Sequence, residues 1–226
     1  MGTAIADILP LAVGVAISVM AIIAVILMLF SKQARSTSVG FLIGWVLGVT
    51  VVATLVVLIA NPAQQATGGE ESLLYAIVHI VLGLFLLFVA YRDWKKRPKP
   101  GEVPEMPKWM SSIDSMTAGK ALGLGALLSG VNPKNLALIL AAGVAIAAAG
   151  LNSTQTIIAL IIFIIVACCS VAAPVIIYLV MGDKATPMLN GWKAWLTHNN
   201  ATVMTILFLV FGVSVLSKGI GAMIGG

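Results

Sequence analysis

The stretch Asn132-Pro133-Lys134-Asn135 interrupts an otherwise apolar run from Ala121 to Gly150, and it decides how this part of the chain folds. A proline removes one helix hydrogen bond and clashes with the carbonyl group four residues earlier, so the sequence predicts a helix break near Pro133. A lysine at membrane depth is costly, and intramembrane ionisable residues usually face a substrate pathway. The flanking asparagines can satisfy released backbone groups or a polar solute. These four residues therefore predict a solute-handling site inside a membrane span.

The composition is that of an integral membrane protein. Hydrophobic residues make up 60% and charged residues 9% of the 226 residues. A helix that crosses the hydrocarbon core needs about 20 mostly apolar residues. The predicted membrane-spanning helices are Ile5–Phe30, Val39–Ala60, Leu73–Tyr91, Ala121–Gly150, Thr156–Met181 and Ala201–Leu216. These six segments leave little sequence for a soluble catalytic domain.

The basic residues predict the orientation in the membrane. Of the 13 lysines and arginines, all except Lys134 and Lys218 lie in the alternate loops 31–38, 92–120 and 182–200. Loops rich in lysine and arginine face the cytoplasm. The sequence therefore predicts a multi-pass protein of the cytoplasmic (inner) membrane with both termini outside.

The long basic loop divides the chain into two halves of three helices each. Residues 1–91 are the first predicted unit and residues 121–226 the second. Between them, residues 92–120 are predicted to form a basic cytoplasmic loop with an amphipathic helix at Trp109–Met116, and a similar element is predicted at Thr186–Thr197. Because each half has an odd number of helices, any repeat of the halves must be inverted in the membrane.

Residues 123–140, with the sequence GLGALLSGVNPKNLALIL, resemble the fourth helix of exporters of the LysE superfamily. The resemblance is closest to the branch of glycopeptidolipid- and sulfolipid-addressing (GAP or Sap) proteins, and residues 24–29, 41–48 and 113–121 also fit it. It implies two inverted three-helix repeats, with the first and fourth helices interrupted at a central site, and export of a solute or envelope lipid. Proteins of this family usually have Ser-Pro-x-Pro in the first helix. Here that place reads Ser18-Val19-Met20-Ala21, so a break in the first helix stays open.

Polar residues near the two interruptions are the candidates for substrate binding. They are Ser18, Ser129, Asn132, Pro133, Lys134 and Asn135. No acidic residue is expected at the depth of Lys134, so its partner is either an anionic substrate group or the carboxyl end of a helix. A purely structural role at the break is the alternative for Lys134. His79 is a candidate proton relay, and a hydrogen-bonded packing residue is the alternative there.

These features favour an exporter that moves an anionic or amphipathic envelope solute, a glycolipid or lipid precursor, across the membrane by alternating access. Two alternatives stay open. A small-solute exporter for amino acids or ions would need an enclosed polar cavity, and an accessory protein for envelope-lipid assembly would not transport at all. We expect no enzyme activity, no metal and no cofactor. The expected partners are membrane lipids and the solute but not nucleic acid, with a homodimer left open; the sequence names neither the substrate nor the energy source.

Overall fold

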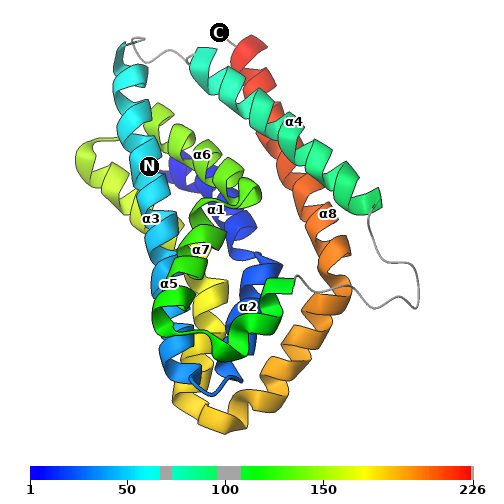
Figure 1. The fold of residues 1–226 in the computed structure, drawn as a ribbon. Helices are drawn as coiled ribbons and strands as arrows, with labels where there is room; N and C mark the ends of the chain where they lie inside the picture. The colour runs from blue at the N-terminus through cyan, green and yellow to red at the C-terminus, as the bar shows by residue number, and fades with distance from the viewer. Residues whose placement is uncertain (67–72, 96–107, 225–226) are drawn as a thin grey trace.

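The computed structural model describes residues 1–66, 73–95 and 108–224, and these ranges are helical without any strand (Figure 1). The helices are α1 (Gly2–Ala16), α2 (Val19–Leu29), α3 (Ala34–Ala66), α4 (Leu73–Lys95), η1 (Lys108–Ser115), α5 (Ala118–Gly130), α6 (Pro133–Ala148), α7 (Ser153–Met181), η2 (Gly182–Ala185) and α8 (Thr186–Ile224). Residues 96–107 of the predicted basic loop lie outside the described ranges.

Several of these helices are long and apolar enough to cross a membrane. Three stretches qualify alone, at Ala34–Asn61, Tyr75–Lys95 and Ser153–Ile224, the last of which includes both α7 and α8. The bent pairs α1–α2 and α5–α6 raise the number of candidate spans to five if each pair is one span. The chain is thus an all-helical membrane protein. Its six predicted spans, its inverted repeats and its orientation stay predictions.

The predicted break near Pro133 is confirmed. Helix α5 ends at Gly130, α6 begins at Pro133, and the two axes are bent by 59°. Proline is favoured at the first position of a helix, where its missing N–H group has no intrahelical acceptor to lose. Asn132 precedes it as the N-terminal cap, because its side chain accepts a hydrogen bond from the backbone N–H of Lys134. The proline therefore begins a new helix here instead of bending a continuous one.

The first helix is also broken, although it lacks the proline pair. Helix α1 ends at Ala16 and α2 begins at Val19, with a bend of 49° between them. Ile17 and Ser18 form the connection. The question that the sequence left open is therefore answered in favour of a break.

Two helix pairs pack with their backbones unusually close. In α3 and α5, a Cβ atom on Gly44 would overlap the carbonyl oxygen of Leu122. In α4 and α8, which run side by side along one flank of the molecule (Figure 1), a Cβ atom on Gly212 would lie 2.8 Å from the side chain of Leu87. Glycines allow such close approach between membrane helices.

Two peripheral segments differ from their predicted form. The predicted element at Thr186–Thr197 and the predicted span Ala201–Leu216 are parts of the single helix α8. The polar residues 197–200 contain neither proline nor glycine, so nothing there stops the helix. The predicted amphipathic helix at Trp109–Met116 is the 3₁₀ helix η1, whose Met110 and Ile113 are buried against the core.

Candidate functional site

A cavity of about 400 Å³ lies where the two helix breaks face α4 and α8. The first residues of α2 and α6 form one wall, and the second half of α4 and the middle of α8 form the other. The lining residues are Ser18, Val19, Met20, Phe85, Phe88, Val89, Arg92, Asp93, Asn132, Pro133, Lys134, Asn200, Met204 and Phe208. The cavity therefore brings together residues from both halves of the sequence.

Lys134 connects the two breaks. Its Nζ atom donates a hydrogen bond of 2.9 Å to the carbonyl oxygen of Ile17, the residue that follows α1. The carboxyl end of a helix carries partial negative charge, which favours a cation there. Of the two partners predicted for Lys134, a helix end is the one observed, and the same side chain also lines the cavity.

A second side chain stabilises the break between α1 and α2. The hydroxyl group of Ser170, on α7, donates a hydrogen bond to the carbonyl oxygen of Ala16. The last carbonyl groups of a helix have no partner within the helix. Here two consecutive ones, those of Ala16 and Ile17, bind side chains from the second half of the chain. These bonds satisfy carbonyl groups that the break leaves without helical partners, although no proline lies at the break.

Asn135 lies behind the cavity wall. Its side chain is fully buried, and its Nδ2 atom donates a hydrogen bond of 2.9 Å to the carbonyl oxygen of Leu128 near the end of α5. Its Oδ1 atom has no hydrogen-bond partner among the residues that the structure describes. Asn135 thus stabilises the α5–α6 break, while Asn132 and Pro133 line the cavity beside Lys134.

Three polar residues of the cavity were not among the predicted site residues. Arg92 and Asp93 lie near the end of α4, with 3.6 Å between the Arg92 Nε and Asp93 Oδ1 atoms. Asn200 lies on α8. Asp93 lines the same cavity as Lys134, but the described residues show no ion pair between them, and the expectation that no acidic residue lies at the depth of Lys134 stays a prediction. In the sequence, Arg92 belongs to the basic loop that predicts the orientation in the membrane, and Asn200 belongs to the predicted loop 182–200. Only the approach of α4 and α8 to the breaks gives them a place in the site.

The remaining wall is apolar. It consists largely of Phe85, Phe88 and Val89 from α4 and Met204 and Phe208 from α8. Phe88 belongs to this wall and is also 62% exposed, which places an edge of the cavity at the surface of the helix bundle.

Two of the predicted residues lie elsewhere. Ser129 is buried, its hydroxyl group donates to the carbonyl oxygen of Ala126 at 3.2 Å, and it packs against Gly48 of α3. His79 is fully buried, with its Nδ1 atom 2.9 Å from the Tyr75 carbonyl oxygen and its ring stacked on that of Tyr75. Neither residue lines the cavity.

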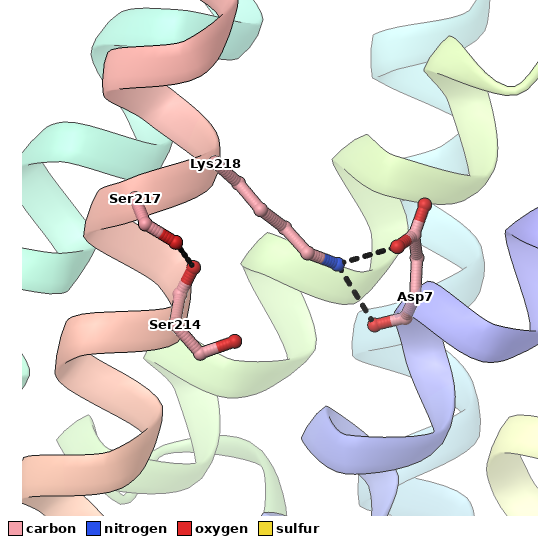
Figure 2. A network of polar contacts seen from close by, with 4 residues as sticks. All are labelled: Asp7, Ser214, Ser217 and Lys218. Atoms are coloured by element: carbon pink, nitrogen blue, oxygen red, sulfur yellow. Dashed lines mark hydrogen bonds and ion pairs between the residues drawn. The ribbon is translucent and has the colours of Figure 1, made fainter.

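An ion pair joins the start of α1 to the end of α8. The Lys218 Nζ atom lies 2.7 Å from the Asp7 Oδ1 atom and 3.5 Å from the Asp7 carbonyl oxygen (Figure 2). The side chains are 27% and 47% exposed, respectively. Lys218 was one of two basic residues outside the predicted cytoplasmic loops, and this contact gives it a structural partner.

The similarity to known proteins covers almost the whole chain. A family model described as Sap, sulfolipid-1-addressing protein, matches residues 8–221, a range that includes both helix breaks and every residue lining the cavity. No curated protein and no solved structure gives a significant match. The match agrees with the branch indicated by residues 123–140, while the wider relationship to the LysE superfamily stays a prediction. The chain therefore belongs to the Sap, sulfolipid-1-addressing protein, family of helical membrane proteins.

Proposed function

We propose that this protein exports an anionic, amphipathic envelope solute, a glycolipid or lipid precursor, across the cytoplasmic membrane. The observation that carries the proposal is the cavity, which has Lys134 on one wall and a largely apolar surface from α4 and α8 on the other. Ligand sites typically combine such an apolar lining with a few placed polar groups. A sulfolipid, the solute named in the family description, has an anionic head group and apolar chains that fit these two walls.

The lining favours a lipid over a small hydrophilic solute. A carrier of amino acids or ions would need an enclosed polar cavity, but eight of the fourteen lining residues here are apolar. A lipid needs a lateral route from the bilayer, and exposed Phe88 lies at the edge where such a route would begin. We therefore assign the edge of the cavity at Phe88 as the lipid entrance.

Alternating access would use two inverted repeats, each a broken helix followed by two further helices. The helix contacts support this division. In this division α1, α2, α3 and α4 of the first half correspond to α5, α6, α7 and α8 of the second. Helix α3 packs against α5 and α6, and its counterpart α7 packs against α1 and α2. Likewise, α2 contacts α8, and its counterpart α6 contacts α4. Exchanging the two halves of the chain therefore reproduces these contacts. Inverted repeats with broken helices at a central site are typical of secondary transporters.

In the predicted orientation this conformation faces the cytoplasm. Arg92 and Asp93 line the cavity near the end of α4, which is the cytoplasmic end of that helix in the predicted orientation. Toward the other side, Phe211 packs against the backbone of α1, since a Cβ atom on Gly14 would lie 2.8 Å from its ring. Further along α8, Lys218 pairs with Asp7 (Figure 2). We propose that this packing and this ion pair close the outer end.

The test compares envelope lipids in cells that lack the protein with those in cells that carry the wild type or a variant. Surface-exposed and total lipids are extracted separately and identified by mass spectrometry. We expect an anionic lipid to be lost from the surface and retained inside without the protein. Lys134→Met should fail to restore it, whereas Gly123→Ala, at a site with nothing within 4 Å, should restore it.

The same experiment separates transport from an accessory role. If Lys134→Met and Phe88→Ala both restore the surface lipid fully, the cavity is not a transport route and the accessory function replaces our proposal. Identical lipids with and without the protein would overturn both. The Ser-Pro-x-Pro pair usual in this family is missing from the first helix, which would favour an accessory role if the helix were unbroken; the observed break in that helix removes this argument.

A further inference from the structure

A second cavity, of about 420 Å³, lies between α4 and α8 away from the helix breaks. Its α4 residues include Leu87, Tyr91 and Trp94, which alternate along the helix with Phe88 and Arg92 of the first cavity. With 3.6 residues per turn, these two sets occupy opposite faces of α4. The second cavity is therefore a separate site on the outward face of the α4–α8 pair.

The glycines of the pair explain why the helices leave a groove here. Near the end of α8 the helices are in close contact, since a Cβ atom on Gly219 would lie 2.7 Å from the backbone nitrogen of Ile80. The close contact continues to Gly212 and Leu87. The lining of the cavity begins at Leu87 and continues to Trp94, toward the cytoplasmic end of α4 in the predicted orientation. The groove thus opens where the close contacts made by these glycines end.

One polar side chain in the groove lacks a partner. Thr205 lines the cavity and is 8% exposed, and its hydroxyl oxygen has no hydrogen-bond partner among the described residues. A threonine in a membrane helix commonly donates to a carbonyl oxygen of its own helix instead. Beside it, Ile206 and Leu209 are apolar. The hydroxyl oxygen is itself buried, so a ligand that brings a hydrogen-bond acceptor into this apolar groove satisfies it once the Thr205 side chain turns toward the groove.

The end of the groove at Tyr91 and Trp94 has the character of a head-group region. The Lys95 ammonium group lies 4.9 Å from the centre of the Tyr91 ring. Tyrosine and tryptophan are enriched at the boundary between hydrocarbon and water, and lysines there attract anionic head groups. Apart from Thr205, the groove is therefore mostly apolar, with a basic residue at one end.

We propose that this groove binds one phospholipid with an anionic head group as a resident lipid. An acyl chain lies against Leu87, Ile206 and Leu209, an ester carbonyl group accepts a hydrogen bond from Thr205, and the phosphate lies near Lys95. The site requires only that the chain is embedded in a membrane. It is independent of the export function, since it does not contain Lys134.

The test uses the purified full-length protein and phosphatidylglycerol with brominated chains, which quench nearby tryptophan fluorescence. Because the chain has 5 tryptophans, the contribution of Trp94 is the difference between the wild type and Trp94→Phe. Brominated phosphatidylcholine is the neutral control lipid. We expect phosphatidylglycerol to quench Trp94 at lower concentrations than phosphatidylcholine does.

Two variants test the assigned contacts. Thr205→Val keeps the shape but removes the donor, and should weaken binding of phosphatidylglycerol by about three- to tenfold, as for one hydrogen bond. Ser217→Ala is the matched control, because this hydroxyl group on the same helix donates to the Ser214 carbonyl oxygen at 3.0 Å and should be silent. Lys95→Gln, at an exposed position, should remove the preference for phosphatidylglycerol.

Equal quenching by the two lipids in the wild type, or an unchanged affinity in both Thr205→Val and Lys95→Gln, would overturn the proposal. So would a dimer in which cysteines placed at Leu209 of two copies cross-link, because a second copy of the chain would then cover the groove.

Discussion

The ammonium group of Lys134 lies 2.9 Å from the carbonyl oxygen of Ile17, which is 117 positions earlier in the chain. One hydrogen bond therefore connects the break between α1 and α2 to the break between α5 and α6. Because the same lysine lines the cavity, a solute that attracts its ammonium group would compete directly with the end of α1. Binding of an anionic solute could in this way release one half of the molecule from the other.

Lys134→Met should stop the appearance of the anionic lipid at the cell surface while the protein still folds. The lost hydrogen bond leaves a carbonyl group without this donor, at a cost of about 1–3 kcal/mol. Removal of a buried charge offsets part of that cost. Surface-lipid analysis and thermal unfolding in detergent measure the two effects. Lys32→Met, the same change at an exposed loop position, is the control. Normal export by Lys134→Met would make the lysine purely structural.

The two breaks differ in how far the sequence can predict them. The α5–α6 break follows from a local cause, because Pro133 cannot continue the preceding helix. The α1–α2 break has no local cause in Ser18-Val19-Met20-Ala21. The carbonyl groups at this break accept hydrogen bonds from Ser170 and Lys134, more than a hundred residues away. Pattern and propensity describe neighbours in sequence, so a break maintained by tertiary contacts escapes them.

The same limit applies to the lining of the cavity. Asn132 and Lys134 were predicted because they are conspicuous in an apolar run. Arg92 follows an apolar span, where a basic residue is expected for topology alone, and its place in the site depends on how α4 approaches the breaks. Ser129 was predicted for its nearness to Pro133, but the helical period turns it toward Gly48 of α3.

Gly44→Ala should destabilise the protein, whereas Gly123→Ala should not. A methyl group on Gly44 would overlap the Leu122 carbonyl oxygen and push α3 and α5 apart, and overpacking of this kind costs about 1–3 kcal/mol. Gly123 has nothing within 4 Å, so alanine there should be neutral or stabilise its helix by up to about 1 kcal/mol. Thermal unfolding of the two purified variants in the same detergent gives the comparison. Equal melting temperatures would mean that the helices do not pack this closely.

The orientation can be tested with single cysteines in a background in which Cys168 and Cys169 are replaced by alanine, since Cys169 is exposed. A cysteine at Ser153, the exposed first residue of α7, should react with a membrane-impermeant maleimide in intact cells. One at Ser36, exposed near the start of α3, should react only after lysis. The reverse result would place the basic loops outside and would exchange the two faces of the proposed transport cycle.

Breaking the ion pair between Asp7 and Lys218 should make the cavity more accessible from outside. The reporter is a cysteine at Met20, a cavity residue, labelled in intact cells in the same cysteine-free background. An ion pair between partly exposed side chains contributes up to about 1 kcal/mol, so Asp7→Asn should raise the labelling rate by up to about fivefold. The exchanged pair, Asp7→Lys with Lys218→Asp, should return the rate toward that of the wild type.

This rescue distinguishes a gate from a general loosening of the protein. Loosening would also increase labelling in the exchanged pair, because both native side chains are gone, whereas a gate needs only opposite charges at the two positions. A cysteine at Ser153 should be labelled equally in all variants and controls for reagent access. If Met20→Cys reacts slowly in every variant, the outer end is closed without the ion pair. The packing of Phe211 against α1 at Gly14 would then be the barrier that opens during export.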